Sequence, residues 1–119
     1  MSDDPRISTQ ELADGITRVA FLDRNILEES VIQDIGDQLD AVIESRDKPK
    51  ILLVFSSVEH LSSAALGTLI TVNNKVQKKD GQLRLCEIDK QIHEVFVITK
   101  LNKLFQIHET EAGALGSFK

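Results

Sequence analysis

Residues 51–67 read ILLVFSSVEHLSSAALG and contain the pattern that decides the fold. After Pro49 the stretch opens with five consecutive apolar residues, which is typical of a short strand buried on both faces of a sheet. From Ser63 to about Lys79 the apolar residues recur at helical spacing. The stretch therefore predicts a buried strand, a loop and a helix that begins at the carboxyl edge of the sheet, where α/β folds place their ligand contacts.

The remaining elements follow from periodicity and turn residues on either side of this stretch. Alternating apolar residues predict an N-terminal hairpin with strands at 7–12 and 16–22, joined by the turn at Asp14-Gly15. Further strands are expected at 82–88 and 104–108, and further helices at 89–101 and 109–118.

The first helix is predicted between Asp23 and Ser45. The triplet Asp23-Arg24-Asn25 interrupts the strand pattern and offers N-cap candidates, and Leu27 begins a series of apolar residues at helical spacing. Asp23 is a candidate cap of this helix. Because it follows a strand, it is also expected near Ser63 at the same edge of the sheet, where it could contact a partner protein, and both roles can hold.

These elements predict an α/β fold. Strands joined by single helices pair in parallel through right-handed crossovers, whereas the two strands of a hairpin are antiparallel. We expect a mixed β-sheet, with an antiparallel N-terminal hairpin and then parallel strands, and about four helices in the order β-β-α-β-α-β-α-β-α. Residues 1–6 are expected to form a flexible leader, and residues 7–119 a single domain.

The composition argues against a nucleic-acid or membrane protein. The net charge is −5 and no basic stripe occurs, so the pattern of a phosphate-backbone binder is missing. No apolar run approaches the roughly 18 residues of a membrane span, and the N-terminal residues lack an apolar signal segment. The single cysteine, Cys86, lies in an apolar stretch, and a buried free thiol suits a reducing compartment. We expect a cytoplasmic protein with no direct contact with nucleic acid or membrane.

The titratable residues predict no catalytic or metal site. The three histidines, His60, His93 and His108, lack metal-ligand spacing, and no Gly-rich phosphate loop occurs, so neither a metal nor a cofactor is expected. Ser63, His60 and Asp23 could be imagined as a hydrolytic set, but the sequence has no Gly-x-Ser-x-Gly elbow. We therefore expect no enzymatic activity.

The pair Ser62-Ser63 is the candidate functional centre. A serine here can cap the helix by accepting a hydrogen bond from one of its free N–H groups. Phosphate on a serine here would be favoured by the partial positive charge of the helix start. It would add roughly −1.5 to −2 charge at the surface and exclude a partner by repulsion and desolvation. Both roles can hold, because one serine can cap while its neighbour accepts phosphate.

The same residues resemble the central segment of the STAS domain family, a hydrophobic strand followed by Asp-Ser-Ser-Gly-x-Gly. Ser62 stands at the aspartate of that motif and Ser63 at its first serine. Ala64 replaces the second serine and Ala65 the first glycine, whereas Gly67 matches the second glycine.

The resemblance spans nearly the whole chain. The order of elements agrees, and Leu22-Asp23 falls where the family commonly has Gly-x-Leu-Asp, with Ala20 in place of the glycine. In the anti-sigma factor antagonists of this family, the serine after the motif's aspartate is phosphorylated by an anti-sigma factor that is also a serine kinase. A serine phosphatase reverses the modification. That serine corresponds to Ser63. Ser62, which stands where the family carries aspartate, is expected to cap the helix and is the alternative acceptor.

The resemblance therefore implies a bacterial protein-interaction switch. With Ser63 unphosphorylated, the domain would bind the anti-sigma factor kinase and so release a sigma factor for transcription. The partner-binding residues are expected to be Asp23, Ser62, Ser63, Ala64 and Gly67. Two alternatives remain open: an interaction module of another signalling complex, and a small-molecule or nucleotide-binding STAS domain.

Overall fold

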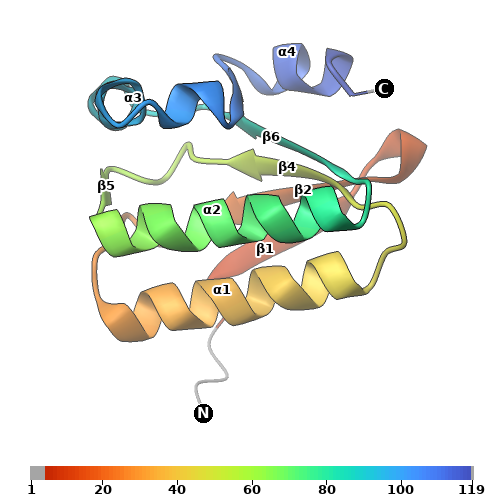
Figure 1. The fold of residues 1–119 in the computed structure, drawn as a ribbon, viewed down its shortest axis with the longest axis horizontal. Coiled ribbons are helices and arrows are strands. Elements are labelled where there is room, and N and C mark those ends of the chain that lie inside the picture. The colour runs from red at the N-terminus through yellow and green to blue at the C-terminus, as the bar shows by residue number, and fades with distance from the viewer. Residues whose placement is uncertain (1–4, 119) are drawn as a thin grey trace.

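The computed structural model describes residues 5–118 and contains one five-stranded sheet, a two-stranded ribbon and four α-helices among them (Figure 1). The strands are β1 (Ile7–Glu11), β2 (Ile16–Phe21), β3 (Asn25–Ile26), β4 (Lys50–Val54), β5 (His60–Leu61), β6 (Gln82–Cys86) and β7 (Gln106–His108). The helices are α1 (Glu29–Glu44), α2 (Ser63–Lys78), α3 (Lys90–Ile98) and α4 (Glu111–Gly116), with short 3-10 turns at Ala13–Gly15 and Leu101–Lys103.

The sheet has the mixed topology that the sequence predicts. Its strand order is β1-β2-β4-β6-β7, with β1 and β2 antiparallel and all later neighbours parallel. The hairpin turn depends on Asp14 and Gly15, which both have positive φ angles, of 62° and 75°. A turn with positive φ favours glycine and tolerates aspartate, which explains this pair of residues.

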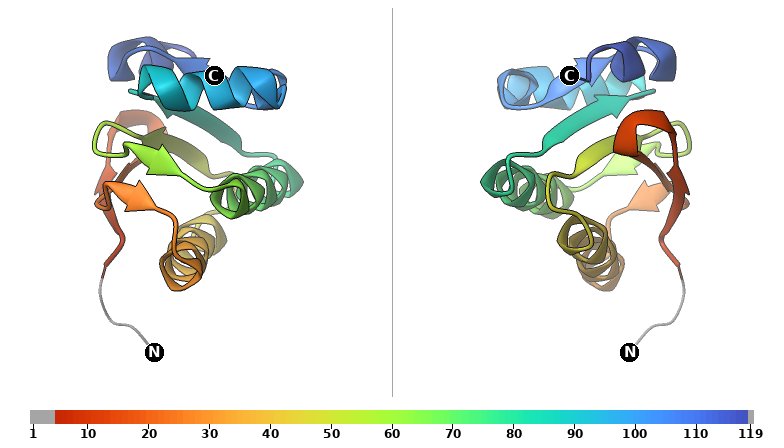
Figure 2. Two further views of the ribbon diagram at one scale, coloured as in Figure 1. Left: turned by 90° about the vertical axis from the view of Figure 1, so that its left-hand side faces the viewer. Right: turned by 90° about the vertical axis from the view of Figure 1, so that its right-hand side faces the viewer.

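The helices cover the sheet unequally. The larger core lies on the face where α1, α2 and α3 pack, and it includes Leu39, Leu69 and Phe96. The smaller core lies on the opposite face beneath α4, where Ala114 packs with Leu52, which is also buried. Figure 2 shows the same division, with α4 on the other side of the sheet from α1 and α2. Successive residues of β4 point to opposite faces, so this strand is buried on both sides, as predicted.

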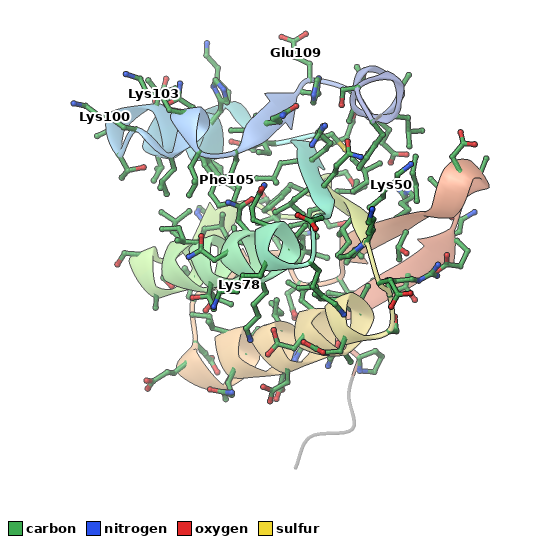
Figure 3. The ribbon with its side chains drawn as sticks, turned by 45° about the vertical axis from the view of Figure 1, so that its right-hand side comes forward. Lys50, Lys78, Lys100, Lys103, Phe105 and Glu109 are labelled. Atoms are coloured by element: carbon green, nitrogen blue, oxygen red, sulfur yellow. The ribbon has the colours of Figure 1, made fainter. Side chains whose placement is uncertain are left out.

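The C-terminal half of the chain is held by aromatic and ionic contacts. Phe105 points into the larger core, where its ring meets Phe96 edge-on at 5.8 Å, whereas Lys100 and Lys103 point outward (Figure 3). On the opposite face, Arg18 forms a two-pronged ion pair with Glu111 of α4, at 2.6 and 3.1 Å. The hydrogen bonds to Arg18 lower the pKa of the Glu111 carboxyl.

The start of the first helix differs from the prediction. Helix α1 begins at Glu29, and its N-cap residue Glu28 makes no side-chain capping bond, so Asp23-Arg24-Asn25 do not cap it. Asn25 instead opens the ribbon strand β3, which pairs in parallel with β5. Leu27, expected on the buried face of the helix, precedes α1 and is 51% exposed.

The structure also bears on the predicted N-terminal leader, on Cys86 and on membrane-spanning helices. Residues 1–4 of the predicted leader lie outside the described residues, but Arg6 is anchored: its backbone N–H donates to Gln38 Oε1 at 2.8 Å. Cys86 is fully buried, as predicted, and burial raises the pKa of its thiol to about 12. Among residues 5–118, no helix is both long and apolar enough to cross a membrane.

Candidate functional site

Ser62 caps helix α2. Its backbone is extended, and its hydroxyl accepts a hydrogen bond from the backbone N–H of Ala65 at 3.2 Å. Its own N–H donates to the carbonyl of Ile26 in β3 at 3.1 Å, so the cap is also tied to the ribbon. The half-buried Ser62 side chain is thereby committed to the structure. This confirms the capping role expected for the residue that stands where the STAS motif has aspartate.

Ser63 is the first residue of α2 and is exposed. Within residues 5–118 no hydrogen bond involves its hydroxyl, which therefore remains available for chemistry at the surface. Ala64 and Gly67 are also exposed, and a Cβ added at Gly67 would meet no atom within 4 Å. Small side chains at Ala64 and Gly67, in the first two turns, leave the helix backbone open to close approach by another protein.

The β3–β5 ribbon joins the two loops that surround this helix start. Asn25 is paired with His60 and Ile26 with Leu61, and the N–H of Glu59 donates to the carbonyl of Arg24 at 2.7 Å. The short strands run side by side at the carboxyl edge of the sheet (Figure 2). The loop after β2 and the loop before α2 therefore form one surface.

Asp23 lies in the loop between β2 and β3, where its carboxylate pairs with the guanidinium of Arg6. Arg6 Nη1 lies 3.3 Å from Asp23 Oδ1, and Arg6 Nε lies 3.5 Å from Asp34 Oδ2 in α1. The second oxygen of Asp23 is buried and has no hydrogen-bond partner among the described residues. The contact of Arg6 with Asp23 was not predicted, because nothing in the sequence around residue 6 indicates a contact with residue 23.

No hydrogen bond between described residues links Ser63, His60 and Asp23. Each is held separately: Ser63 starts α2, His60 lies in β5, and Asp23 pairs with Arg6. A nucleophile needs a base within hydrogen-bond reach, and the base needs an orienting partner. The described residues therefore give the Ser63 hydroxyl no hydrogen-bonded base.

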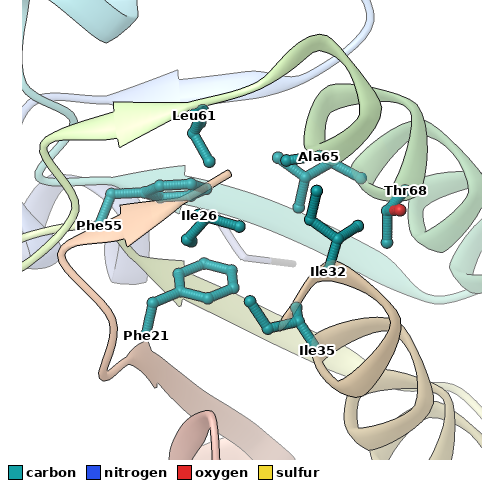
Figure 4. Close-up of a pocket in the computed structure, with 9 residues that line it drawn as sticks. Phe21, Ile26, Ile32, Ile35, Phe55, Leu61, Ala65 and Thr68 are labelled. Carbon is teal, nitrogen blue, oxygen red and sulfur yellow. The ribbon is translucent and has the colours of Figure 1, made fainter. Parts of the chain in front are cut away.

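Apolar side chains support the ribbon from below. Phe21 and Phe55, at the ends of β2 and β4, face each other with ring centroids 4.8 Å apart. Together with Ile26, Leu61 and Ala65 they surround a small apolar hollow beneath the first turn of α2 (Figure 4). This packing positions the cap residue Ser62 and hence the exposed Ser63.

A groove of about 320 Å³ lies beside the start of α2. We call it the α2–α3 groove; it is lined by Leu27, Glu59, His60, Leu61, Leu66, Gln91, Ile92 and Val95. Leu27 and Val95 are 51% and 40% exposed although both are apolar. Large exposed apolar residues that gather around a groove are typical of a protein-interaction surface. The groove was not predicted from the sequence, because its lining comes from residues 27, 59–66 and 91–95, which only tertiary packing brings together.

The family follows from a comparison with known proteins. Residues 17–114 match the model of the STAS domain. The chain belongs to the STAS domain family. Relatives of this STAS domain include the anti-sigma F factor antagonist of Paenibacillus polymyxa, which is 24% identical over 78 residues, covering 66% of this chain and 67% of the relative. BtrV of Bordetella bronchiseptica, which also carries the name of an anti-sigma factor antagonist, is 23% identical over 93% of both chains.

Solved structures confirm the fold. An anti-sigma-factor antagonist (STAS) domain protein from Planctomyces limnophilus has a TM-score of 0.84 at 19% identity, covering 93% of this chain and 96% of that one. The Bacillus protein SpoIIAA, solved in its phosphorylated form, has a TM-score of 0.69 at 13% identity, covering 92% and 96%. The STAS domain described above therefore has the mixed sheet and helical layers of these proteins.

Proposed function

We propose that this STAS domain is an anti-sigma factor antagonist that binds an anti-sigma factor kinase through the start of α2. The main observation behind the proposal is that the two serines have different surroundings. Ser62 caps the helix, and Ser63 presents a free hydroxyl at the surface. The names of its relatives support the same function. Binding in the unphosphorylated state would sequester the kinase and release a sigma factor.

Phosphorylation of Ser63 would switch this interaction off. The kinase would transfer the γ-phosphoryl group of ATP to the Ser63 oxygen, with loss of the hydroxyl proton and release of ADP. The product adds roughly −1.5 to −2 charge at a helix start that accommodates anions. A partner packed closely over Ala64 and Gly67 would have to accommodate and desolvate this charge. The complex should therefore dissociate without any change of fold.

Catalysis belongs to the partners in this proposal. The anti-sigma factor kinase adds the phosphate and a serine phosphatase removes it, while the STAS domain is the substrate of both. A cytoplasmic location and the absence of an enzymatic activity of its own are parts of the same proposal. Ser62 is disfavoured as the acceptor because its hydroxyl is half-buried and bonded to Ala65.

A second candidate is an interaction module for a different signalling complex. The observation that favours it is Ser62 itself, which stands where the family motif has an aspartate. A kinase that recognises the acidic neighbour of its target serine would find a neutral hydroxyl here. In that case the same surface would bind its partner constitutively.

The test pairs a kinase assay with a binding assay. The domain is incubated with ATP and each purified anti-sigma factor kinase of its source organism, and the modified residue is mapped by mass spectrometry. We expect phosphate on Ser63, none in Ser63→Ala, and retained phosphorylation in Ser62→Asp, which preserves a capping side chain. Binding to the same kinase should fall at least tenfold in Ser63→Asp. Equal binding by wild type and Ser63→Asp, with no phosphate on Ser63, would favour the constitutive module.

A further inference from the structure

A second hollow lies where β6 and β7 end, away from the start of α2. The two strands are parallel neighbours, but the helices that follow them pack on opposite faces of the sheet. Ile92 and Phe96 of α3 belong to the larger core, whereas Ala114 of α4 belongs to the smaller one. Figure 2 shows the two helices diverging above the sheet. In open α/β sheets, ligands bind in the crevice at the carboxyl ends of strands whose connections diverge in this way.

The structure has a hollow at this point, which we call the β6–β7 crevice. Its volume is about 480 Å³, within the range of roughly 300–1,000 Å³ that small-molecule sites occupy. The end of β6 and the start of α3 contribute Ile88, Lys90 and His93, and the end of β7 contributes Ile107, His108 and Glu109. Figure 3 shows Glu109 on the turn that leads from β7 into α4.

The lining combines an apolar surface with hydrogen-bonding groups. Ile88 and Ile107 are partly buried and pack against the larger core. The ammonium group of Lys90 and the imidazoles of His93 and His108 can all donate hydrogen bonds. Glu109 supplies the one carboxylate of the lining. No group of three His, Cys, Asp or Glu side chains in residues 5–118 is arranged to hold a metal ion. The hydrogen-bond donors and apolar side chains of the lining together suit an organic anion.

His108, which lines the crevice, has an unpaired ring nitrogen. Its Nε2 atom is buried and has no hydrogen-bond partner within the described part of the chain. A buried polar atom without a partner costs free energy, and natural structures rarely leave one without a reason. Rotation of the imidazole about its Cβ–Cγ bond would redirect Nε2, and a ligand in the crevice would then supply the missing partner.

We propose that the β6–β7 crevice binds a small monocarboxylate with a short apolar chain. The carboxylate would accept hydrogen bonds from Lys90 and the two imidazoles, while the apolar chain would lie against Ile88 and Ile107. The negative charge of Glu109 disfavours a ligand of higher charge, such as inorganic phosphate. The crevice and the α2–α3 groove share no lining residue: Gln91 and Val95 of α3 line the groove, whereas Lys90 and His93 line the crevice.

Nuclear magnetic resonance titration of the ¹⁵N-labelled domain tests the proposal. Sodium isovalerate is the probe, sodium phosphate is the competing anion, and sodium chloride keeps the ionic strength constant. We expect saturable shifts of backbone amide signals at residues 88–93 and 107–110 with isovalerate, and at least fivefold weaker binding of phosphate. Lys90→Gln and His108→Phe should each weaken isovalerate binding at least fivefold.

Two control variants separate this site from other effects. Lys78→Gln removes an exposed lysine at the far end of α2, and Ser63→Ala removes the proposed phosphate acceptor; both should bind isovalerate as wild type does. If His108→Phe does not fold, the exposed pair Lys90→Gln and His93→Gln carries the test. Shifts that do not saturate, that phosphate reproduces equally, or that persist in Lys90→Gln and His93→Gln would overturn the proposal.

Discussion

The hydroxyl of Ser62 accepts a hydrogen bond from the backbone N–H of Ala65 at 3.2 Å, and this bond separates the roles of two adjacent serines. Ser62 satisfies a free donor at the start of α2, while Ser63 faces solvent. A modification at Ser63 can therefore add charge to the surface without removing the cap of the helix.

Replacing the cap should destabilise the domain. Ser62→Ala leaves the N–H of Ala65 without its side-chain acceptor, which should lower the free energy of unfolding by about 1 kcal/mol. Ser62→Asp should retain the cap and most of the stability. Urea unfolding followed by circular dichroism measures both, with Ser63→Ala as the matched control. A loss in Ser63→Ala as large as that in Ser62→Ala would contradict the division of roles.

Gly67 offers a way to separate stability from binding. A Cβ at this position meets nothing within 4 Å, so Gly67→Ala should raise the free energy of unfolding by about 0.5–1 kcal/mol through a less flexible unfolded chain. The same methyl group would obstruct a partner packed closely on α2 and weaken its binding. Gly81→Ala is the contrasting variant, since its Cβ would collide with the carbonyl oxygen of Pro49 and destabilise the fold. Unchanged partner affinity in Gly67→Ala would exclude close packing at this turn.

The α2–α3 groove should contribute to partner affinity. Leu27→Ser and Val95→Ser remove apolar surface that is already exposed, so the free energy of unfolding should change by less than about 0.5 kcal/mol. Partner affinity should fall roughly tenfold in each if these side chains are buried in the complex. Val97→Ser is the control, because Val97 is 47% exposed and does not line the groove. Isothermal titration calorimetry with the partner kinase measures the affinity of each variant. Equal affinities in all three variants would show that the groove is not part of the interface.

The ion pair between Arg6 and Asp23 should have a small energetic effect. Both side chains are about a quarter exposed, at 23% and 25%, so the coupling in a double-mutant cycle of Arg6→Gln and Asp23→Asn should be about 0.5 kcal/mol. The single variants should mainly loosen the loop between β2 and β3, which hydrogen exchange at residues 22–27 would detect. Protection factors that stay at the wild-type level would show that the β3–β5 ribbon alone orders this loop.

Cys86 predicts a change of stability at alkaline pH. Burial raises the pKa of its thiol from 9.0 to about 12, so the folded state keeps a proton that the unfolded state loses. This contribution to stability is complete below pH 9 and is lost as the pH rises towards 12. Cys86→Ala should flatten that part of the pH profile in chemical unfolding. Rapid labelling of the native thiol by Ellman's reagent at pH 8 would show that it is accessible instead.

Local patterns predicted much of this molecule. The apolar run that forms β4, the periodicity of α2 and the Asp14-Gly15 turn each depend on neighbours within a few residues, and the structure confirms all three. The cap at Ser62 also depends on a short-range contact and was predicted correctly. Such features arise from the chemistry of adjacent residues, which the sequence displays directly.

The surroundings of Ser63 could not be predicted from local sequence patterns alone. Sequence patterns were enough to predict the mixed α/β sheet, the helix that starts at its carboxyl edge and the two serines at that start. The pairing of Asp23 with Arg6, the pairing of β3 with β5 and the groove between α2 and α3 became visible only in the folded chain. These contacts join segments distant along the chain, so they depend on how the layers pack rather than on any local period. The surface around Ser63 is for this reason a property of the folded domain.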